Sequence, residues 1–193
     1  MGDAIRTFIA FPLPDHLVRL AGDLQAELKD HGLDLRWVRP ANIHLTLKFL
    51  GEIPSQRVAK VTDAMQAAGR ETPPLSLMVQ GMGVFPGIRA PKVLWVGLGG
   101  ATEALGRMQA RLEERLAEVG FAPERRPFKA HLTLARIKAR LDADRLLQGL
   151  QAAGGYAPRP FEVQEMVLYR SELRPRGAVY TPLAGTALCA DAR

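Results

Sequence analysis

The sequence predicts an α+β fold in which antiparallel sheets carry helices on their outer faces. Strand-like segments follow one another in pairs along the chain, which favours antiparallel neighbours over a doubly wound parallel sheet. Segments with helical spacing of apolar residues separate these pairs. The tetrapeptide HLTL occurs at 44–47 and again at 131–134, each time in a strand that follows a long helix. We therefore expect two similar lobes around a central cleft that carries the two repeats.

The expected strands are rich in β-branched, leucine and aromatic residues and are bounded by proline, glycine or charged turns. They are residues 6–13, 35–40, 42–53, 75–85, 92–98, 126–137, 161–173 and 178–188. The prolines and glycine of 86–91 predict the turn between the fourth and fifth of these strands.

The expected helices have apolar residues at intervals of three and four. They are residues 15–31, 55–68, 102–119 and 142–153. In the first, Leu17, Leu20 and Leu24 fall on one face. Gly32 and Gly120 mark the ends of the first and third helices, because glycine readily adopts the left-handed conformation that ends a helix.

The length of 193 residues and the ordinary composition predict one two-lobed domain over 1–193. The formal net charge of +6 suits an anionic partner such as RNA or a phosphorylated small molecule. A single cysteine, Cys189, excludes an intrachain disulfide and a cysteine metal cluster. Residues 1–16 have neither the pattern of a signal peptide nor that of a membrane span. We expect a cytoplasmic monomer that does not associate with membranes.

The repeated tetrapeptide places the same side chains on the same face of two strands. Side chains alternate along a strand, so His44 and Thr46 share one face, while His131 and Thr133 share one face of the second strand. The intervening leucines point the other way, under a helix. Two facing lobes would bring two histidines and two hydroxyls into one cleft, whereas a single HLTL would be read as an amphipathic strand.

Two histidines and two threonines suit phosphate-ester chemistry without a metal. Histidine titrates near neutrality, so one can accept a proton while the other donates one. Threonine hydroxyls can donate to the non-bridging oxygens of the phosphate. A zinc site would need a third ligand and supporting carboxylates, and the chain has no H-E-x-x-H. It also lacks the G-x-S-x-G of a serine triad and a phosphate-binding glycine loop. We expect no metal and no cofactor.

The motifs and their flanking segments resemble the two-histidine (2H) phosphoesterases, which are defined by two H-x-T-x motifs. Within them, the chain resembles the bacterial and archaeal RNA 2′,3′-cyclic phosphodiesterases, historically called 2′-5′ RNA ligases. The resembling pieces are RTFIAFPLP, NIHLTLKFLGEI, VLWVGL, RPFKAHLTLARI and VYTPL. The resemblance implies that His44 is the proton donor, that His131 is the proton acceptor, and that Thr46 and Thr133 hold the phosphate.

The resemblance also implies a reaction. A 2′,3′-cyclic phosphate at an RNA 3′ end, such as that of a tRNA fragment, would be opened to a 2′-phosphate. The reverse reaction, with an RNA 5′-hydroxyl as nucleophile, would form a 2′-5′ linkage. One alternative is a 2H phosphoesterase for a small cyclic nucleotide, an ADP-ribose derivative or 2′-5′ oligoadenylate. Another is an RNA-binding module without catalysis.

Further candidates for substrate binding are basic or aromatic residues near the two motif strands. They are Lys48, Arg136, Tyr180, Arg36, Arg39, Arg125, Arg126 and Lys129. Strand alternation places Lys48 on the His44 face and Phe49 in the core. It places Arg136 opposite His131, so that Arg136 reaches a phosphate only across a bulge or from a strand end. Solvated surface is the alternative for the charged residues, and core packing is the alternative for Tyr180.

Overall fold

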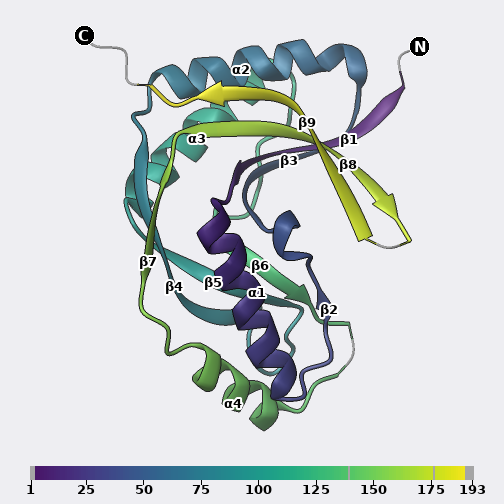
Figure 1. Ribbon diagram of the computed structural model, residues 1–193. Coiled ribbons are helices and arrows are strands. Elements are labelled where there is room, and N and C mark those ends of the chain that lie inside the picture. Colours follow the sequence, from purple (N-terminus) through teal and green to yellow (C-terminus); the bar gives the residue numbers. More distant parts are fainter. Residues whose placement is uncertain (1–2, 139, 176, 190–193) are drawn as a thin grey trace.

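A computed structural model describes residues 3–138, 140–175 and 177–189 (Figure 1). Within them, nine strands form one curled antiparallel sheet in the order β7-β4-β5-β6-β3-β1-β8-β9, with β2 beside β6. The predicted α+β class with antiparallel sheets is confirmed. The strands are β1 (Ala4–Pro12), β2 (Arg36–Trp37), β3 (His44–Pro54), β4 (Leu75–Phe85), β5 (Val93–Gly100), β6 (His131–Arg136), β7 (Arg159–Val163), β8 (Glu165–Arg174) and β9 (Gly177–Ala187).

The four predicted helices are confirmed. They are α1 (Asp15–Asp30), α2 (Val58–Arg70), α3 (Thr102–Glu118) and α4 (Ala143–Ala153). Gly32 follows α1 and Gly120 follows α3, with φ of 73° and 87°, so both adopt the left-handed conformation expected after a helix. The start predicted for α2 at Ser55 is instead a short 3₁₀-helix, Ser55–Arg57. None of the helices in the described part of the chain is long and apolar enough to span a membrane.

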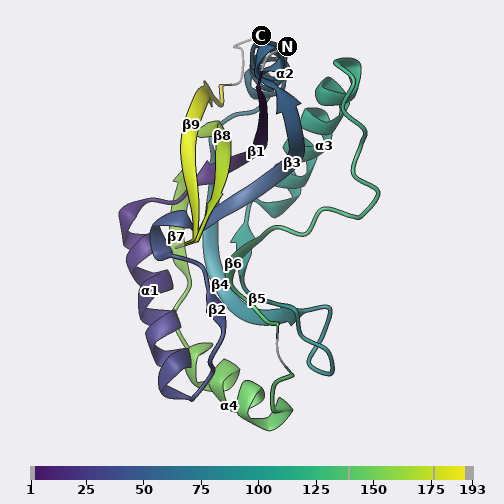
Figure 2. The same ribbon diagram turned by 90° about the vertical axis from the view of Figure 1, so that its right-hand side faces the viewer.

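Two lobes share the sheet, and each lobe is covered by a pair of helices. In the lower part of Figure 1, α1 and α4 pack against each other beside β4, β5 and β6. In the upper part, α2 packs against α3 and β9, near β1 and β3. Seen from the side in Figure 2, α1 and α3 lie on opposite sides of the molecule. The helix that precedes β3 in the sequence therefore belongs to the lobe of β6, and the helix that precedes β6 belongs to the lobe of β3.

The apolar faces of these helices cover the leucines of the motif strands. Leu45 and Leu134 are fully buried, and Leu132 is 2% exposed. Leu24 of α1 and Leu112 of α3 belong to the same continuous apolar core. Burying a leucine side chain stabilises a fold by about 1.5–3 kcal/mol, so the inward face of each motif strand is strongly fixed. The predicted orientation of the HLTL leucines is confirmed.

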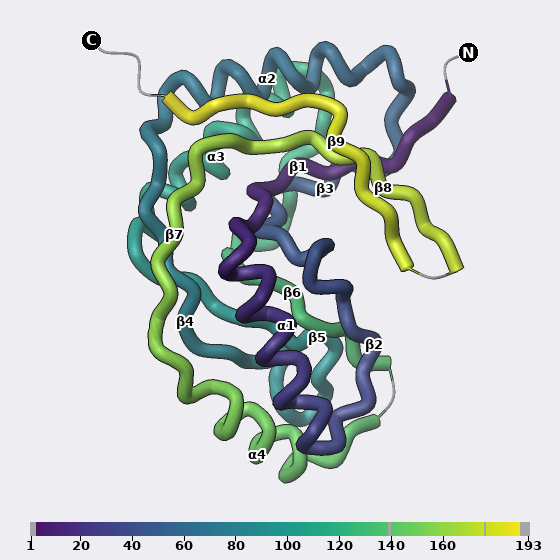
Figure 3. Tube along the Cα trace, viewed as in Figure 1, coloured from purple at the N-terminus to yellow at the C-terminus, as the bar shows by residue number. Residues whose placement is uncertain are grey.

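Three expected strands differ from the structure. The segment 161–173 divides at Gln164 into β7, which pairs with β4, and β8, which pairs with β1 and β9. Figure 3 follows this segment along the edge from the lower lobe to the upper lobe. The segment 126–137 is a strand only from His131, and 35–40 is a strand only at Arg36–Trp37. Strand composition predicted continuous strands, but ladder pairing ends at Trp37 and begins only at His131, and Gln164 separates two segments that pair with different strands.

Candidate active site

The two motif strands are direct neighbours at the centre of the sheet. β3 and β6 pair antiparallel through Leu45 and Leu132. Continuing that register by one residue places His44 opposite Thr133 and His131 opposite Thr46. The leucines point into the core. The four polar side chains therefore share the other face of the sheet. The predicted meeting of the two motifs is thus a crossed arrangement in which each histidine lies beside the threonine of the other motif.

Both histidines are oriented by the same backbone contact. Nδ1 of His44 donates to the Asn42 carbonyl at 2.8 Å, and Nδ1 of His131 donates to the Lys129 carbonyl at 2.6 Å. A carbonyl only accepts, so Nδ1 carries the proton in both rings. Nε2 is then the nitrogen that can accept a proton when the ring is neutral or donate one when it is charged. The two rings are equivalent in tautomer and suited to opposite proton-transfer roles.

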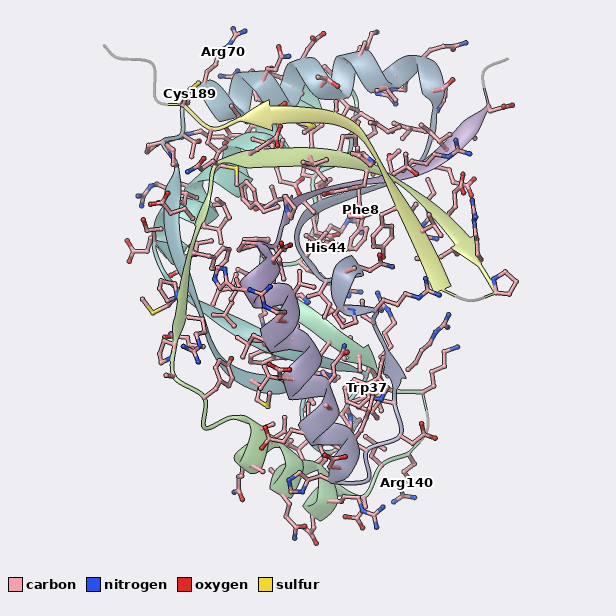
Figure 4. All side chains as sticks on the ribbon, in the orientation of Figure 1. Phe8, Trp37, His44, Arg70, Arg140 and Cys189 are labelled. Atoms are coloured by element: carbon pink, nitrogen blue, oxygen red, sulfur yellow. The ribbon has the colours of Figure 1, made fainter. Side chains whose placement is uncertain are left out.

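His44 is held between aromatic rings. It stacks on Phe8 with ring centroids 4.7 Å apart and meets the edge of Tyr180 at 5.4 Å. Figure 4 shows His44 and Phe8 side by side between the two lobes. Burial lowers the pKa of His44 below its ordinary value, and the nearby charge of His131 lowers it further, while the bond to Asn42 opposes both. The neutral form of His44 is therefore favoured in the ligand-free protein.

Asn42 fixes both the ring of His44 and the hairpin of β8 and β9. Its carbonyl accepts from the His44 ring, and its side-chain Nδ2 donates to the Ala178 carbonyl at 2.8 Å. Asn42 ends a 3₁₀-helix, Pro40–Asn42, where strand composition had predicted 35–40 and 42–53 as strands. No local sequence pattern indicates this role for Asn42, because its partner lies more than 130 positions away.

A β-bulge follows the threonine in each motif. In β3, Ala10 pairs with Thr46 and Ile9 with Lys48, so Leu47 is an extra residue. In β6, Trp95 pairs with Thr133 and Leu94 with Ala135, so Leu134 is an extra residue. Each bulge shifts the side-chain alternation by one position.

The bulge in β3 reverses two expectations. Lys48 faces the core side of the sheet, and only 7% of its surface is exposed, so its assignment as a substrate-binding residue on the His44 face is wrong. Its ammonium contacts a carboxylate oxygen of Glu113 at 2.5 Å and the Ala122 carbonyl at 2.8 Å. Phe49, expected in the core, is 61% exposed and lines the cleft.

The bulge in β6 brings Arg136 to the motif face. Alternation had placed Arg136 opposite His131 unless a bulge intervened, and the structure contains that bulge. Arg136 lines the same cleft as His44, Thr46 and Thr133. Its charge also acts on the hydroxyl of Tyr180, whose pKa is raised by burial and lowered in part by Arg136 and Arg6.

The cleft beside the motifs has a volume of about 470 Å³. Among its described lining residues, four are arginines and none is acidic, so the charge of the lining favours an anionic ligand. The arginines are Arg6, Arg36, Arg39 and Arg136. Aromatic side chains of Phe8, Trp37, Phe49 and Tyr180 form other parts of its wall, and the β8–β9 hairpin adds Ser171, Leu173, Gly177 and Ala178. Arg36, Arg39 and Tyr180 line this cleft, and their role in substrate binding stays a prediction.

Sequence reasoning missed Arg6, Phe8 and Phe49. Arg6 and Phe8 alternate on one face of the predicted first strand, and this was the available signal. Their relevance depends on β1 lying next to β3, which the sequence does not show. Phe49 was missed because the bulge at Leu47 is a tertiary feature.

The remaining basic candidates lie on the segment that leads into β6. Arg125 and Arg126 are exposed and are not among the described residues that line the cleft. Lys129 is next to the second motif, since its carbonyl holds the His131 ring and its ammonium lies 5.6 Å from the centroid of Phe85. Within the described part of the chain, no group of three or more His, Cys, Asp or Glu is placed to hold a metal ion.

This arrangement defines the class of two-histidine phosphoesterases, in which paired H-x-T-x motifs share one face of a central sheet. A family model described as LigT like Phosphoesterase matches residues 11–95 and 97–180, and each segment contains one HLTL. The matches cover most of the chain, and this protein therefore belongs to the LigT-like phosphoesterase family.

Two of the similar curated proteins share a name. An RNA 2′,3′-cyclic phosphodiesterase of Methanothermobacter thermautotrophicus is 30% identical over 93% of this chain and 96% of its own. One of Thermus thermophilus is 33% identical over 93% and 88%. Among solved structures, TT0787 of Thermus thermophilus has a TM-score of 0.79 at 27% identity, covering 97% of this chain and 100% of its own. Escherichia coli LigT complexed with 3′-AMP has a TM-score of 0.72 at 26% identity, covering 96% and 99%.

We expect Lys48→Met to weaken the fold without weakening substrate binding. The change leaves the buried Glu113 carboxylate without its cation, and breaking a buried ion pair costs about 3–5 kcal/mol. Thermal unfolding should show a lower Tm, and Lys48→Met with Glu113→Leu should recover part of the loss. If Lys48 contacted the substrate, Lys48→Met would instead raise KM and reduce the dependence of KM on salt.

Proposed function

We propose that this protein is an RNA 2′,3′-cyclic phosphodiesterase that opens a terminal cyclic phosphate to a 2′-phosphate. The observation that carries the proposal is the crossed pair of motifs on β3 and β6, with both histidine Nδ1 atoms committed to backbone carbonyls. This arrangement offers two Nε2 atoms and two hydroxyls to one ligand. The names of the similar proteins support the same activity.

The reaction is an in-line displacement at phosphorus. Nε2 of His131 takes a proton from water as the water oxygen bonds to phosphorus. The bond from phosphorus to the 3′ oxygen breaks, and Nε2 of His44 gives its proton to that oxygen. The products are a 2′-phosphate and a 3′-hydroxyl. Thr46 and Thr133 donate to the non-bridging oxygens, where negative charge concentrates in the transition state. No step uses a metal ion or a cofactor.

Substrate charge prepares His44 for the role of donor. Burial favours the neutral ring, whereas the donor must be protonated. A bound cyclic phosphate carries one negative charge, which favours the charged ring and raises its pKa. We infer that substrate binding is accompanied by proton uptake at His44, so that the donor is loaded when a phosphate is in place.

The basic cleft favours a polynucleotide over a small molecule. One phosphate needs only the motif residues, yet Arg6, Arg36 and Arg39 also line the cleft. Additional cations are useful when additional phosphates are present. A small cyclic nucleotide or 2′-5′ oligoadenylate is the competing substrate class. A substrate comparison decides between them, because the proposal requires a higher kcat/KM for an oligonucleotide than for a mononucleotide 2′,3′-cyclic phosphate.

The 2′-5′ ligation would use the same groups in the same roles, with a different nucleophile. An RNA 5′-hydroxyl in place of water would lose its proton to His131 as its oxygen bonds to phosphorus. The bond from phosphorus to the 3′ oxygen would break, and the phosphate would then join the 2′ oxygen to the 5′ oxygen as a 2′-5′ linkage. We propose that this ligation occurs when a 5′-hydroxyl end is held beside the cyclic phosphate, without ATP or a covalent nucleotide. Water at about 55 M is the competing nucleophile, so hydrolysis should dominate with free ends.

We expect an RNA oligonucleotide with a 2′,3′-cyclic phosphate to be hydrolysed in the presence of EDTA, because the acid, the base and the phosphate donors are all side chains. Chromatography against synthetic 2′- and 3′-phosphate standards identifies the product, which should be the 2′-phosphate. Loss of activity in EDTA that zinc or manganese restores would contradict the mechanism, and a 3′-phosphate product would reverse the assigned leaving group.

Replacing either histidine by glutamine should lower kcat by about 10²–10⁴-fold, the usual contribution of a general acid or base. Glutamine fills much of the space of His44 against Phe8, so the circular dichroism spectrum and Tm should change little. The double variant should be no slower than about the worse single variant, because both groups act in one step. A variant that retains more than half of the wild-type rate would show that its histidine takes no part in the chemistry.

The pH profiles of kcat/KM and kcat should differ on their alkaline side. Because the pKa of His44 is lowered, its ring loses the proton at a lower pH than an ordinary histidine. As the pH rises, the free enzyme therefore loses the protonated donor before the ordinary value of 6.5 is reached. The profile of kcat/KM reports the free enzyme, and that of kcat reports the complex. The alkaline limb of kcat should therefore lie at the higher pH. Limbs at the same pH would argue against proton uptake on binding.

Thr46→Val and Thr133→Val should each lower kcat by about 10- to 150-fold, the value of a charge-assisted hydrogen bond. Valine keeps the β-branched shape and the strand preference of threonine. KM should change less than kcat, since the bonds strengthen toward the transition state. Variants with a lower Tm and an unchanged kcat would make the threonines structural residues of their strands.

A further inference from the structure

A buried glutamine contacts the bulge in β6. Gln25 of α1 is 2% exposed, and its side-chain nitrogen donates to the Leu134 carbonyl at 3.0 Å and to the Val38 carbonyl at 2.7 Å. Leu134 is the extra residue of the bulge. Its carbonyl also accepts from the backbone nitrogen of Val38 at 2.9 Å. Both lone pairs of this carbonyl and both hydrogens of the Gln25 amide are therefore used.

A second buried glutamine occupies the equivalent place in the other lobe. Gln109 of α3 is 8% exposed, and its side-chain nitrogen donates to the Leu47 carbonyl at 3.4 Å and to Glu113 at 3.1 Å. Leu47 is the extra residue of the bulge in β3. Each lobe thus has a helix whose glutamine binds the carbonyl of the residue directly after H-x-T.

We propose that Gln25 and Gln109 are positioning residues that hold the two bulges and thereby keep Arg136 and Phe49 on the motif face of the sheet. The inference deepens the proposed function, on which it rests, by naming residues that act through Arg136 and Phe49 and touch no substrate. Because the bulge sets the alternation of everything that follows it, a regular strand would turn Arg136 toward α1 and Phe49 toward α3.

The chemistry of an amide suits this role. A bulge takes one carbonyl out of the regular ladder, and an unsatisfied buried carbonyl is costly. A buried glutamine supplies two donors without a charge, so it can bind that carbonyl and a second acceptor together. Leucine at the same helix position would fill the space but remove the donors, and the Leu134 carbonyl would keep only the bond from the Val38 nitrogen. The helix face that covers each motif strand therefore carries one polar residue directly over the bulge.

The test is a set of four crossed double-mutant cycles, which combine each glutamine with Arg136 and with Phe49. Gln25→Met keeps the length of the side chain and removes both donors. It should lower kcat/KM for the cyclic-phosphate oligonucleotide by about 10-fold, the value of one charge-assisted hydrogen bond lost at Arg136. Arg136→Gln should lower it at least as much, and the double variant should lose no more than Arg136→Gln alone, since Gln25 acts through Arg136.

The other glutamine gives the opposite coupling. Gln109→Met combined with Arg136→Gln should show multiplied losses, because Gln109 holds Phe49 and not Arg136. Gln109→Met combined with Phe49→Ala should lower kcat/KM no further than Phe49→Ala alone. Gln25→Met combined with Phe49→Ala should lower kcat/KM by the product of the two single losses. A residue that merely stabilises the fold would not distinguish the two lobes in this way.

Two control variants measure effects of stability and of glutamine loss alone. Thr72→Val removes a buried hydroxyl that donates to the Ala68 carbonyl, away from the bulges. Gln66→Met changes an exposed glutamine on α2. Both should keep the wild-type kcat/KM when assayed well below their Tm. If Gln25→Met does not fold, Gln25→Asn, which is one methylene too short to reach Leu134, carries the same expectations.

Hydrogen exchange of side-chain amides tests the contacts without activity. In wild type, the NH₂ groups of Gln25 and Gln109 should exchange slowly by NMR, and that of Gln66 should exchange fast. Fast exchange at Gln25, or cycles in which Gln25 and Arg136 are additive, would overturn the inference. A wild-type protein inactive on cyclic phosphates would overturn the proposed function instead, and the exchange rates would still decide whether the bulges are held.

Discussion

The antiparallel contact between β3 and β6 is the constraint on which the site depends. It joins the two halves of one sheet, β7, β4, β5, β6 and β2 on one side and β3, β1, β8 and β9 on the other, through Leu45 and Leu132, and it sets the distance between the two motifs. Both leucines are buried, so sliding the register by one residue would turn them to the cleft and the histidines to the core. Core packing therefore fixes the relative position of two groups that must act on one phosphorus atom.

The two halves of the sheet are alike in the residues of the proposed chemistry and differ in the residues that follow each bulge. Each has a histidine bonded through Nδ1 to a carbonyl two residues earlier, a threonine two residues later and a bulge after it. Beyond the bulge, Phe49 stands in one half and Arg136 in the other. His44 is enclosed by Phe8 and Tyr180, which lowers its pKa. A symmetric frame thus holds a site with two chemically different sides.

Alternation along a strand predicted the motif face correctly up to Thr46 and Thr133 and failed one residue later. The failure has a local cause, since Leu47 and Leu134 are extra residues that no partner strand opposes. An expected rim lysine, Lys48, became half of a buried ion pair, and an expected core residue, Phe49, became part of the cleft wall. A leucine within a strand does not indicate a bulge. The nearest signal was a buried-face glutamine in each helix.

The sequence by itself determined the α+β class, the four helices, the inward face of the motif strands and the four motif residues, because these depend on apolar periodicity and on a repeated pattern. The tertiary structure alone decided that α1 covers the strand of the second motif and α3 that of the first, and that Arg6 and Phe8 reach the cleft. Those features depend on which strands become neighbours. Strand pairing is settled by contacts between residues far apart in the chain, and local sequence does not encode it.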